Sequence, residues 1–386
     1  FTFDNYLEVF TSPTILPLLQ TTVVYSAAGI IIGLPIAFGL AFLTERTDLP
    51  LRSWMYTLMF IPLSTPPFAT ALGWVLLLGD RAGSINQWLR YFFNLDINAG
   101  PFNIFTLEGM IFVHALGIVP SMWLLLTGVL RNMDPNLEEA AVASGAGKWR
   151  TLFVVTIPLM APALLAIMVL FFVAGMESLE TPLAIGSTAG IQVLATQIYR
   201  MINVSSDQGF AYGPPAALGI FSLAVGVMGI SIYLYLMRRA NKFSVVTGKG
   251  YRPRLIKLGP WKYAAVAAIG LFMFVKVVLP FSILVVASLQ KFYQPVLPGR
   301  KIAWTAANYE TLFDFRFFGG PFLNSIMVSV AAATITMVLV SFFAWQVVRW
   351  PSKLTQLVNA LAFMPLSIPA VISGLAFLLV FIGTPL

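Results

Sequence analysis

The residues of this chain that could do chemistry are few, and the most informative are three acids in or beside apolar runs. Glu177 and Glu180 lie in the segment 175–182, and Glu108 lies near the start of another apolar run. Ionisable side chains at membrane depth are costly and generally functional, and carboxylate oxygens suit hard cations. The three acids are therefore candidates to line a pathway for a polar solute. The alternative is that they are hydrated helix ends at a membrane surface.

Other kinds of catalytic or metal chemistry find little support. The chain has no cysteine and one histidine, His114, which excludes thiolate chemistry and zinc sites of the Cys/His type. A lone histidine in an apolar run is more often a packed polar residue bonded to a neighbouring helix, and Lys276 should reach a helix neighbour or a polar cavity. Lys148 and Lys249 each follow a glycine but lack the rest of a nucleotide-binding phosphate loop. We therefore expect neither a cofactor nor a metal in this chain.

The elements that must position these residues are membrane helices. Of the 386 residues, 59% are hydrophobic and 10% are charged, and the mean hydropathy is +0.86. An ordinary soluble domain carries about 25% charged residues, so this composition cannot build a surface that faces water. The formal net charge of +8 arises from bases clustered between the apolar runs, as in cytoplasmic loops. That distribution excludes a nucleic-acid-binding protein.

Eight apolar runs are long enough to cross a bilayer as helices, for which about 20 residues are needed. We expect them near 15–43, 54–79, 106–130, 158–178, 214–237, 262–289, 321–347 and 356–385. Unpaired backbone cannot face lipid, so runs of this length should be helical. The predicted fold class is an all-α integral membrane protein, a polytopic helical bundle.

The orientation follows from the segment 238–262, which holds eight basic residues and no acid. By the positive-inside rule this segment should be cytoplasmic. Alternation then puts three further loops on the cytoplasmic side, 44–53, 131–157 and 348–356.

The chain contains an internal repeat with a constant offset. The dipeptide Asn-Tyr at 5–6 recurs at 308–309, and Phe-Ile-Pro-Leu-Ser-Thr-Pro at 60–66 recurs as Phe-Met-Pro-Leu-Ser-Ile-Pro at 363–369, each 303 residues later. Ordinary kinks explain prolines in membrane helices but not the constant register. Parallel repeats of this kind predict two halves around an axis along the membrane normal, with a pathway between them.

The repeat also predicts the division of the chain. The first half should span 1–237, a basic cytoplasmic linker 238–262, and the start of the second half 263–386. A helix precedes the second copy without a counterpart before the first, so one N-terminal helix is expected to be missing, and the second half to be truncated.

Loop 131–157 carries the most specific pattern. Asp134 followed by Pro135 is a good helix start, and the Glu-Glu-Ala-Ala-Val-Ala stretch that follows favours helix. Gly145 can end that helix with a left-handed turn. The pattern predicts a short helix, a tight turn and a second helix starting near Lys148. The alternative is a plain amphipathic connector between two membrane helices.

Glu139, Ala140 and Ala141, followed at fixed spacing by Gly145 and Pro158, resemble the EAA loop of the permease subunits of binding-protein-dependent ABC importers. The closing motif departs conservatively from the family, with Val-Thr-Ile-Pro in place of Ile-x-Leu-Pro. The resemblance covers essentially the whole chain. It implies a coupling helix seated in a groove of a separate ATPase. There Glu139 would make polar contacts, Ala140 and Ala141 would pack, and Gly145 would form the bend.

The resemblance also implies partners and a location. It predicts a type I fused permease of two parallel repeats, multi-pass in the lipid bilayer of a bacterial inner membrane and not itself an enzyme. Two copies of an ATP-binding cassette ATPase would bind ATP and magnesium, and a periplasmic or lipid-anchored substrate-binding protein would deliver the substrate. The outer loops 80–105 and 186–213 are where that protein would dock, although their aromatic residues also fit interfacial belts.

The substrate is predicted from resemblance alone. Among permeases with both halves fused in one chain, this sequence is most similar to the ferric iron importers, notably in the linker segment 246–253. Thiamine and polyamine importers are alternatives. A secondary transporter driven by an ion gradient is the alternative from another class, because parallel repeats also occur there, and a membrane enzyme ranks third.

Overall fold

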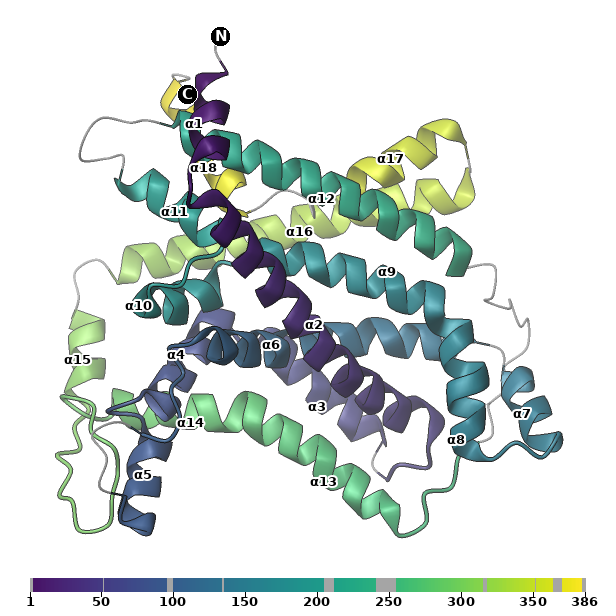
Figure 1. Cartoon of the computed structure of the whole chain (residues 1–386), viewed down its shortest axis with the longest axis horizontal. Helices are drawn as coiled ribbons and strands as arrows, with labels where there is room; N and C mark the ends of the chain where they lie inside the picture. Colours follow the sequence, from purple (N-terminus) through teal and green to yellow (C-terminus); the bar gives the residue numbers. More distant parts are fainter. Residues whose placement is uncertain are drawn as a thin grey trace.

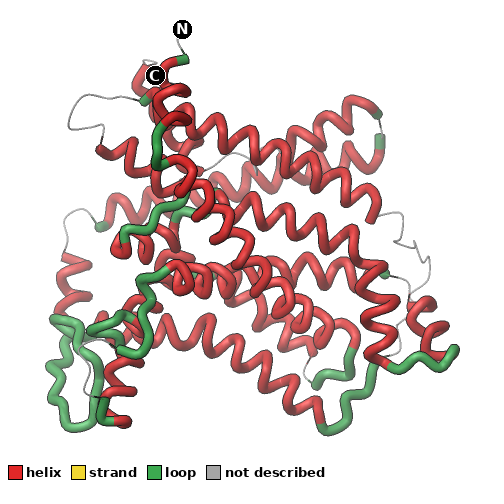
Figure 2. The backbone as a smooth tube through the Cα atoms, viewed as in Figure 1, coloured by secondary structure: helices red, strands yellow, loops and turns green. Residues whose placement is uncertain are grey.

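The computed structural model describes residues 3–50, 52–95, 100–133, 135–204, 212–240, 255–314, 318–350, 352–363 and 370–383. These residues form helices joined by loops (Figure 2), and the β pairing among them is limited to two isolated bridges, Thr47 with Ile256 and Gln290 with Trp304. The all-α fold predicted from the apolar runs is confirmed for this part of the chain.

Two of the first six helices are long and apolar, and the other four have 8 to 13 residues. The long α6 begins where the hydroxyl of Thr106 accepts a hydrogen bond from the amide nitrogen of Gly109 at 3.1 Å, an N-cap of the usual kind. The six are α1 (Asp4–Thr11), α2 (Ile15–Arg46), α3 (Arg52–Ser64), α4 (Pro67–Leu78), α5 (Ser84–Phe93) and α6 (Leu107–Asn132).

The later helices include three π-helical turns, two of which join α-helices into longer rods. These wide turns occur mostly as single-turn insertions and often near functional sites. The elements are α7 (Pro135–Ala143), α8 (Lys148–Thr151), η1 (Leu152–Thr156), α9 (Ile157–Met176), η2 (Pro182–Gly186), α10 (Ser187–Ala189), α11 (Leu194–Val204), α12 (Gly213–Ala240), α13 (Trp261–Met273), η4 (Phe274–Val278), α14 (Leu279–Ser288), α15 (Ala307–Asp314), α16 (Gly319–Arg349), α17 (Lys353–Phe363) and α18 (Ala370–Gly383).

The core lies where α2, α6 and α9 pack against one another. Its largest fully buried side chains include Tyr25 of α2, Trp123 of α6 and Met160 of α9. On the outside of this group α12 covers α9, and α14 packs against α4. The packing leaves the three central helices in fixed relative positions, which is what a site built from their side chains requires.

Six helices of the described chain are long and apolar enough to cross a membrane. They are α2, α6, α12, α16 and the composite helices Trp149–Met176 and Trp261–Ser288. The pair α3 and α4 would make a seventh span, but the two helices are bent by 87°. The run predicted at 54–79 is therefore a broken span and not one straight helix. The run predicted at 356–385 includes residues 364–369, which lie outside the described residues.

The loops gather at two opposite ends of the bundle. Figure 1 shows α7 and α8 at one end, near the end of α2 and the start of α13, and α5, α10 and α15 at the other. The predicted topology, in which successive loops lie on alternate sides of the membrane, requires the loops to be separated in this way. We call the end with α7 and α8 the cytoplasmic end, following the predicted orientation.

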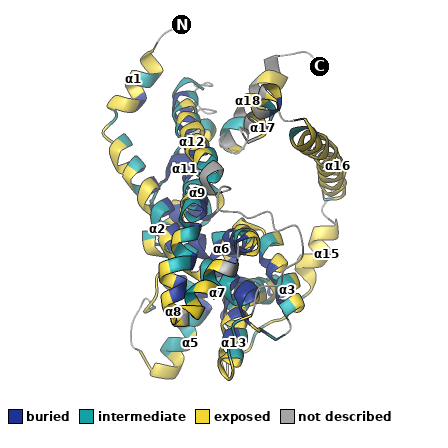
Figure 3. Cartoon of the chain, turned by 90° about the vertical axis from the view of Figure 1, so that its right-hand side faces the viewer, coloured by how far each residue is buried: buried dark blue, intermediate teal, exposed yellow. Residues whose placement is uncertain are grey.

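The helices repeat with the offset found in the sequence. α15 begins 303 residues after α1, α16 ends 303 residues after α2, and α18 begins 303 residues after α4. α16 buries no residue and stands apart from the bundle (Figure 3), whereas its counterpart α2 lies in the core. Most of the predicted linker falls on residues 241–254, outside the described part of the chain.

Candidate functional site

A cavity of about 340 Å³ lies between the bend of α3 and α4, the middle of α6, the end of α9 and η4. Polar and charged side chains make up about half of its wall, so it suits a polar solute better than lipid. These side chains are Thr65, Thr70, His114, Ser121, Glu177, Ser178, Glu180, Thr181 and Lys276. Because polar groups are costly to bury among apolar helices, their concentration here marks the candidate site.

The bend that forms one wall of the cavity arises from consecutive prolines. Pro66 has an extended backbone, with φ −62° and ψ 125°, and Pro67 takes the first position of α4, where proline is well tolerated. Proline also disfavours the helical conformation in the residue before it. The hydroxyl of Thr65 donates to the carbonyl oxygen of Pro62 at 2.7 Å. The bend coincides with the repeated segment 60–66, whose structural role the sequence analysis missed.

Of the three predicted pathway acids, Glu177 and Glu180 both line this cavity. Glu177 follows the last residue of α9, and its amide nitrogen donates to the carbonyl oxygen of Val173 at 3.2 Å. Its Oε1 atom is buried and has no hydrogen-bond partner among the described residues. Glu108 lies elsewhere, on the exposed first turn of α6. The structure thus brings together two of the three acids.

Two basic side chains share the cavity wall. Lys276 is 3% exposed, and its place in the lining confirms that it reaches a polar cavity. The ring of His114 lies 4.5 Å from the ring of Tyr25, centroid to centroid, and is wedged between Gly29 of α2 and Gly175 of α9. Its Nε2 atom is buried without a hydrogen-bond partner in the described structure. The histidine is packed as predicted, but this nitrogen does not make the predicted bond to a neighbouring helix.

The cavity lining combines oxygen ligands with one positive charge. Carboxylate and hydroxyl oxygens are the ligands that hard cations prefer, and Lys276 adds a positive charge that weakens cation binding. Among the described residues no three His, Asp or Glu side chains come together as a metal site would require.

At the cytoplasmic end, loop 131–157 folds as a short helix, a turn and a second helix. Gly145 has φ 86°, a backbone conformation that favours glycine, and its amide nitrogen donates to the carbonyl oxygen of Val142 at 3.0 Å. The second helix, α8, starts at Lys148. The predicted helix–turn–helix is confirmed, while Asp134, its predicted first cap, lies outside the described residues.

The outward face of α7 is small and apolar. Ala140 is exposed, while Glu139 and Ala141 are half-buried, and the larger side chains of Leu137 and Val142 are 48% and 55% exposed. Pro158, the last residue of the predicted motif, lies exposed in the first turn of α9.

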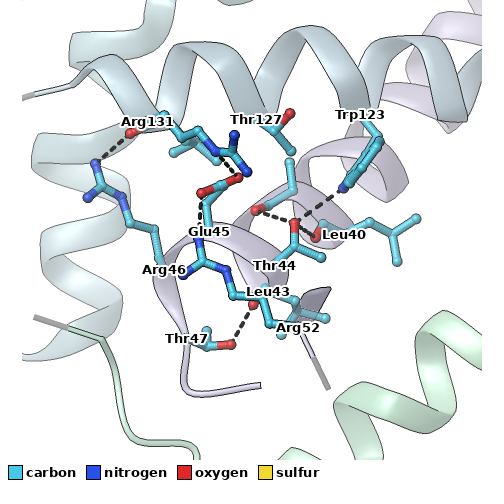
Figure 4. A network of polar contacts seen from close by, with 12 residues as sticks. Leu40, Leu43, Thr44, Glu45, Arg46, Thr47, Arg52, Trp123, Thr127 and Arg131 are labelled. Atoms are coloured by element: carbon cyan, nitrogen blue, oxygen red, sulfur yellow. Dashed lines mark hydrogen bonds and ion pairs between the residues drawn. The ribbon is translucent and has the colours of Figure 1, made fainter. Parts of the chain in front are cut away.

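A buried ionic cluster joins the helix ends beneath this loop (Figure 4). Glu45, the last residue but one of α2, accepts hydrogen bonds from Nη2 of Arg52 at 2.7 Å and from Nε of Arg131 at 2.8 Å. The Glu45 side chain is 4% exposed, and bonds between charged groups are the stronger kind. The cluster therefore connects the end of α2, the start of α3 and the end of α6.

The neighbouring Arg46 connects the bundle to the loop itself. Its Nη2 donates to the carbonyl oxygen of Leu130 at 3.0 Å and lies 3.7 Å from Oε1 of Glu138 on α7. The same Glu138 atom accepts a hydrogen bond from the hydroxyl of Thr156 at 2.9 Å. The sequence analysis did not single out Arg46, Glu138 or Thr156. One signal could have identified Arg46: it recurs as Arg349, 303 residues later.

The chain is similar to known membrane proteins over most of its length. The family described as binding-protein-dependent transport system inner membrane component matches residues 29–242. A protein of Haemophilus influenzae named as the ferric transport system permease FbpB 1 is 27% identical over 358 residues, covering 90% of this chain and 54% of the relative. The ferric transport system permease protein FbpB of Actinobacillus pleuropneumoniae is 26% identical over 358 residues, covering 90% and 49%.

The chain thus spans about half the length of these curated relatives. Among solved structures, a bacterial alginate ABC transporter in complex with an alginate pentasaccharide-bound periplasmic protein aligns with a TM-score of 0.48 at 22% identity, covering 64% of this chain and 85% of that chain.

Proposed function

This chain belongs to the family of binding-protein-dependent transport system inner membrane components, and from that premise we propose that it is the permease subunit of an ATP-driven importer in a bacterial inner membrane. Its apolar helices make it a multi-pass membrane protein. In the proposed division of labour the permease forms the pathway and performs no covalent chemistry. A separate ATPase binds ATP and magnesium, and a binding protein delivers the substrate.

We propose ferric iron as the substrate. The two relatives described above are named as ferric transport permeases, and the cavity presents the carboxylates of Glu177 and Glu180 among hydroxyl groups. A hard cation prefers such oxygen ligands. Thiamine and polyamines are the alternative substrates, and uptake measured for each of the three with its own binding protein would separate them.

The observation that carries the importer proposal is the way loop 131–157 is held. Its α7 exposes a small apolar face, while Glu138 lies against Arg46 and Thr156 on the side of the bundle. In the proposal Glu139, Ala140 and Ala141 contact the ATPase, and a force on α7 reaches the membrane helices through the Arg46 contacts.

The transport cycle we propose is alternating access. A loaded binding protein docks at the outer loops, the ATPase pair closes on ATP, and the coupling loops rock the two halves so that the cavity opens first outward and then inward. The internal repeat supports a second coupling loop and therefore a second ATPase copy. Broken helices such as α3–α4 are common at the binding sites of transporters.

The experiment that tests this proposal is mass spectrometry of the proteins that co-purify with the intact, tagged protein in mild detergent. An ATPase should accompany the wild type and be lost with Gly145→Asp, because a side chain at φ 86° strains the turn beside α7. Gly299→Asp is the matched control, since Gly299 has φ 79°, open surroundings and a place at the opposite end. Melting curves of both variants would separate lost binding from unfolding.

Loss of the ATPase in both variants, or its retention in both, would contradict the coupling-loop assignment. If no ATPase accompanied the wild type, a transporter driven by an ion gradient would become the better explanation.

A further inference from the structure

A second and larger hollow lies at the cytoplasmic end, between α2, the rod formed by α8, η1 and α9, and the start of α13. Its volume is about 940 Å³, near the upper end of the range for ligand pockets, roughly 300–1,000 Å³. Apart from Thr47, Lys257 and two tryptophans, its lining side chains are apolar. This hollow, which we call the α2–α13 groove, shares no lining residue with the polar cavity.

One edge of the groove is held in place by the segment before α13. The amide nitrogen of Ile256 donates to the carbonyl oxygen of Arg46 at 2.9 Å, and the carbonyl oxygen of Ile256 accepts from the amide nitrogen of Asp48 at 3.1 Å. The amide nitrogen of Leu258 donates to Oδ1 of Asp48 at 2.7 Å. Lys257, between these two anchored residues, is therefore fixed at the end of α2.

Two of the lining residues are tryptophans, one from α8 and one from α13, and basic residues follow them in sequence. Trp149 and Trp261 line the groove and are each 75% exposed, and tryptophan is enriched where a membrane meets water. Arg150 and Lys262 follow them in sequence. Together with Lys257, which lines the groove, they place three bases near Asp48 at this end of the described structure. The indoles thus mark the headgroup level, with net positive charge there and an apolar hollow beside it.

We propose that the α2–α13 groove binds an anionic phospholipid of the cytoplasmic leaflet, with its phosphate near Lys257 and its acyl chains along α2. Basic pockets between membrane helices on the cytoplasmic side bind anionic headgroups. Room for a chain exists beside Gly39, where no atom lies within 4 Å of the position a Cβ would take. The inference uses the membrane orientation but not the proposed substrate, so it can fail while the importer proposal stands.

The site has a mechanical consequence because α8 and η1 form one of its walls. Trp149, Leu152 and Phe153 of that wall belong to the second helix of loop 131–157. A lipid seated in the groove therefore touches the helix that follows α7 and its turn.

The test is native mass spectrometry of the intact protein released from bilayers that contain equal amounts of phosphatidylglycerol and phosphatidylethanolamine. The wild type should retain one phosphatidylglycerol in preference to phosphatidylethanolamine. Lys257→Gln should lower that retention about fivefold, the factor that one basic residue contributes near an anionic surface. Gly39→Trp, which places an indole ring in the hollow, should lower retention of both lipids.

Two control variants match these changes outside the groove. Lys291→Gln removes an exposed base at the opposite end, and Gly270→Trp adds the same bulk at a helical glycine with open surroundings. Both should retain phosphatidylglycerol like the wild type, and melting curves would show that all four variants are folded. Equal retention of the two lipids, no retained lipid, or the same loss in the controls would overturn the proposal.

Discussion

Replacing Glu45 with glutamine removes the negative charge at the centre of the ionic cluster. The native carboxylate is 4% exposed and accepts two bonds, at 2.7 and 2.8 Å. A bond to a charged group contributes about 1.5–3 kcal/mol, and breaking a fully buried pair costs about 3–5 kcal/mol. The Arg52 and Arg131 side chains are 35% and 57% exposed, so both guanidinium groups keep part of their hydration. We therefore expect a loss of about 2–3 kcal/mol.

Thermal unfolding in detergent, followed by tryptophan fluorescence without any partner, measures this loss. For a chain of this size it corresponds to a melting temperature lower by roughly 3 °C. Glu310→Gln is the control, because Glu310 is an exposed acid on α15, and it should shift stability by no more than about 0.5 kcal/mol. Combined with Arg131→Gln, the Glu45 variant should lose less than the sum of the two single losses, since the two residues share a bond. A Glu45 variant that melts like the control, or strictly additive losses, would refute the reasoning.

Three further changes test the cavity and its supports. Glu177→Gln should reduce reconstituted ferric uptake about tenfold, equivalent to about 1.4 kcal/mol of lost attraction for the cation, at an unchanged melting temperature; normal uptake would remove Glu177 from the pathway. Gly29→Ala should destabilise the folded protein by about 1–3 kcal/mol, because the added methyl group meets the His114 ring. Gly39→Ala, whose methyl group points into open space, should be neutral or should stabilise the protein by up to about 1 kcal/mol. Identical melting temperatures of the two variants would contradict this packing. Tyr293→Phe should lower the free energy of unfolding by about 1–2 kcal/mol, because the lost hydroxyl bonds to Ser84 at 2.6 Å and to the carbonyl oxygen of Leu76 at 2.8 Å. If the variant denatured like the wild type, these two bonds would contribute nothing to stability.

The positions of the membrane helices were predictable because length and apolarity are local properties of the sequence. The predicted runs at 15–43 and 106–130 correspond to α2 and α6 within a few residues. The place of Glu177 beside a cavity also follows from a local argument, the cost of a charge at membrane depth. The left-handed turn at Gly145 was predictable from the residue type alone.

The bend and the ionic cluster were not predictable in the same way. Proline is tolerated in membrane helices, so Pro66 in one sequence does not tell a kink from a break of 87°. Glu45 and Arg52 follow an apolar run and are typical of hydrated loop charges. The burial of Glu45 depends on three helix ends converging, which is a property of the tertiary packing and leaves no local pattern.

The helix α3 connects the ionic cluster at one of its ends with the polar cavity at the other. Its first residue, Arg52, is bonded to Glu45, and near its last turn Pro62 and Leu63 line the polar cavity. Its 13 residues, at 1.5 Å each, make an arm of about 20 Å. A tilt of about 10° around the fastened end moves the cavity wall by about 3 Å, close to the diameter of a water molecule. In the proposed transport cycle α3 would act as a lever, in which a small rotation at the membrane surface changes the width of the cavity.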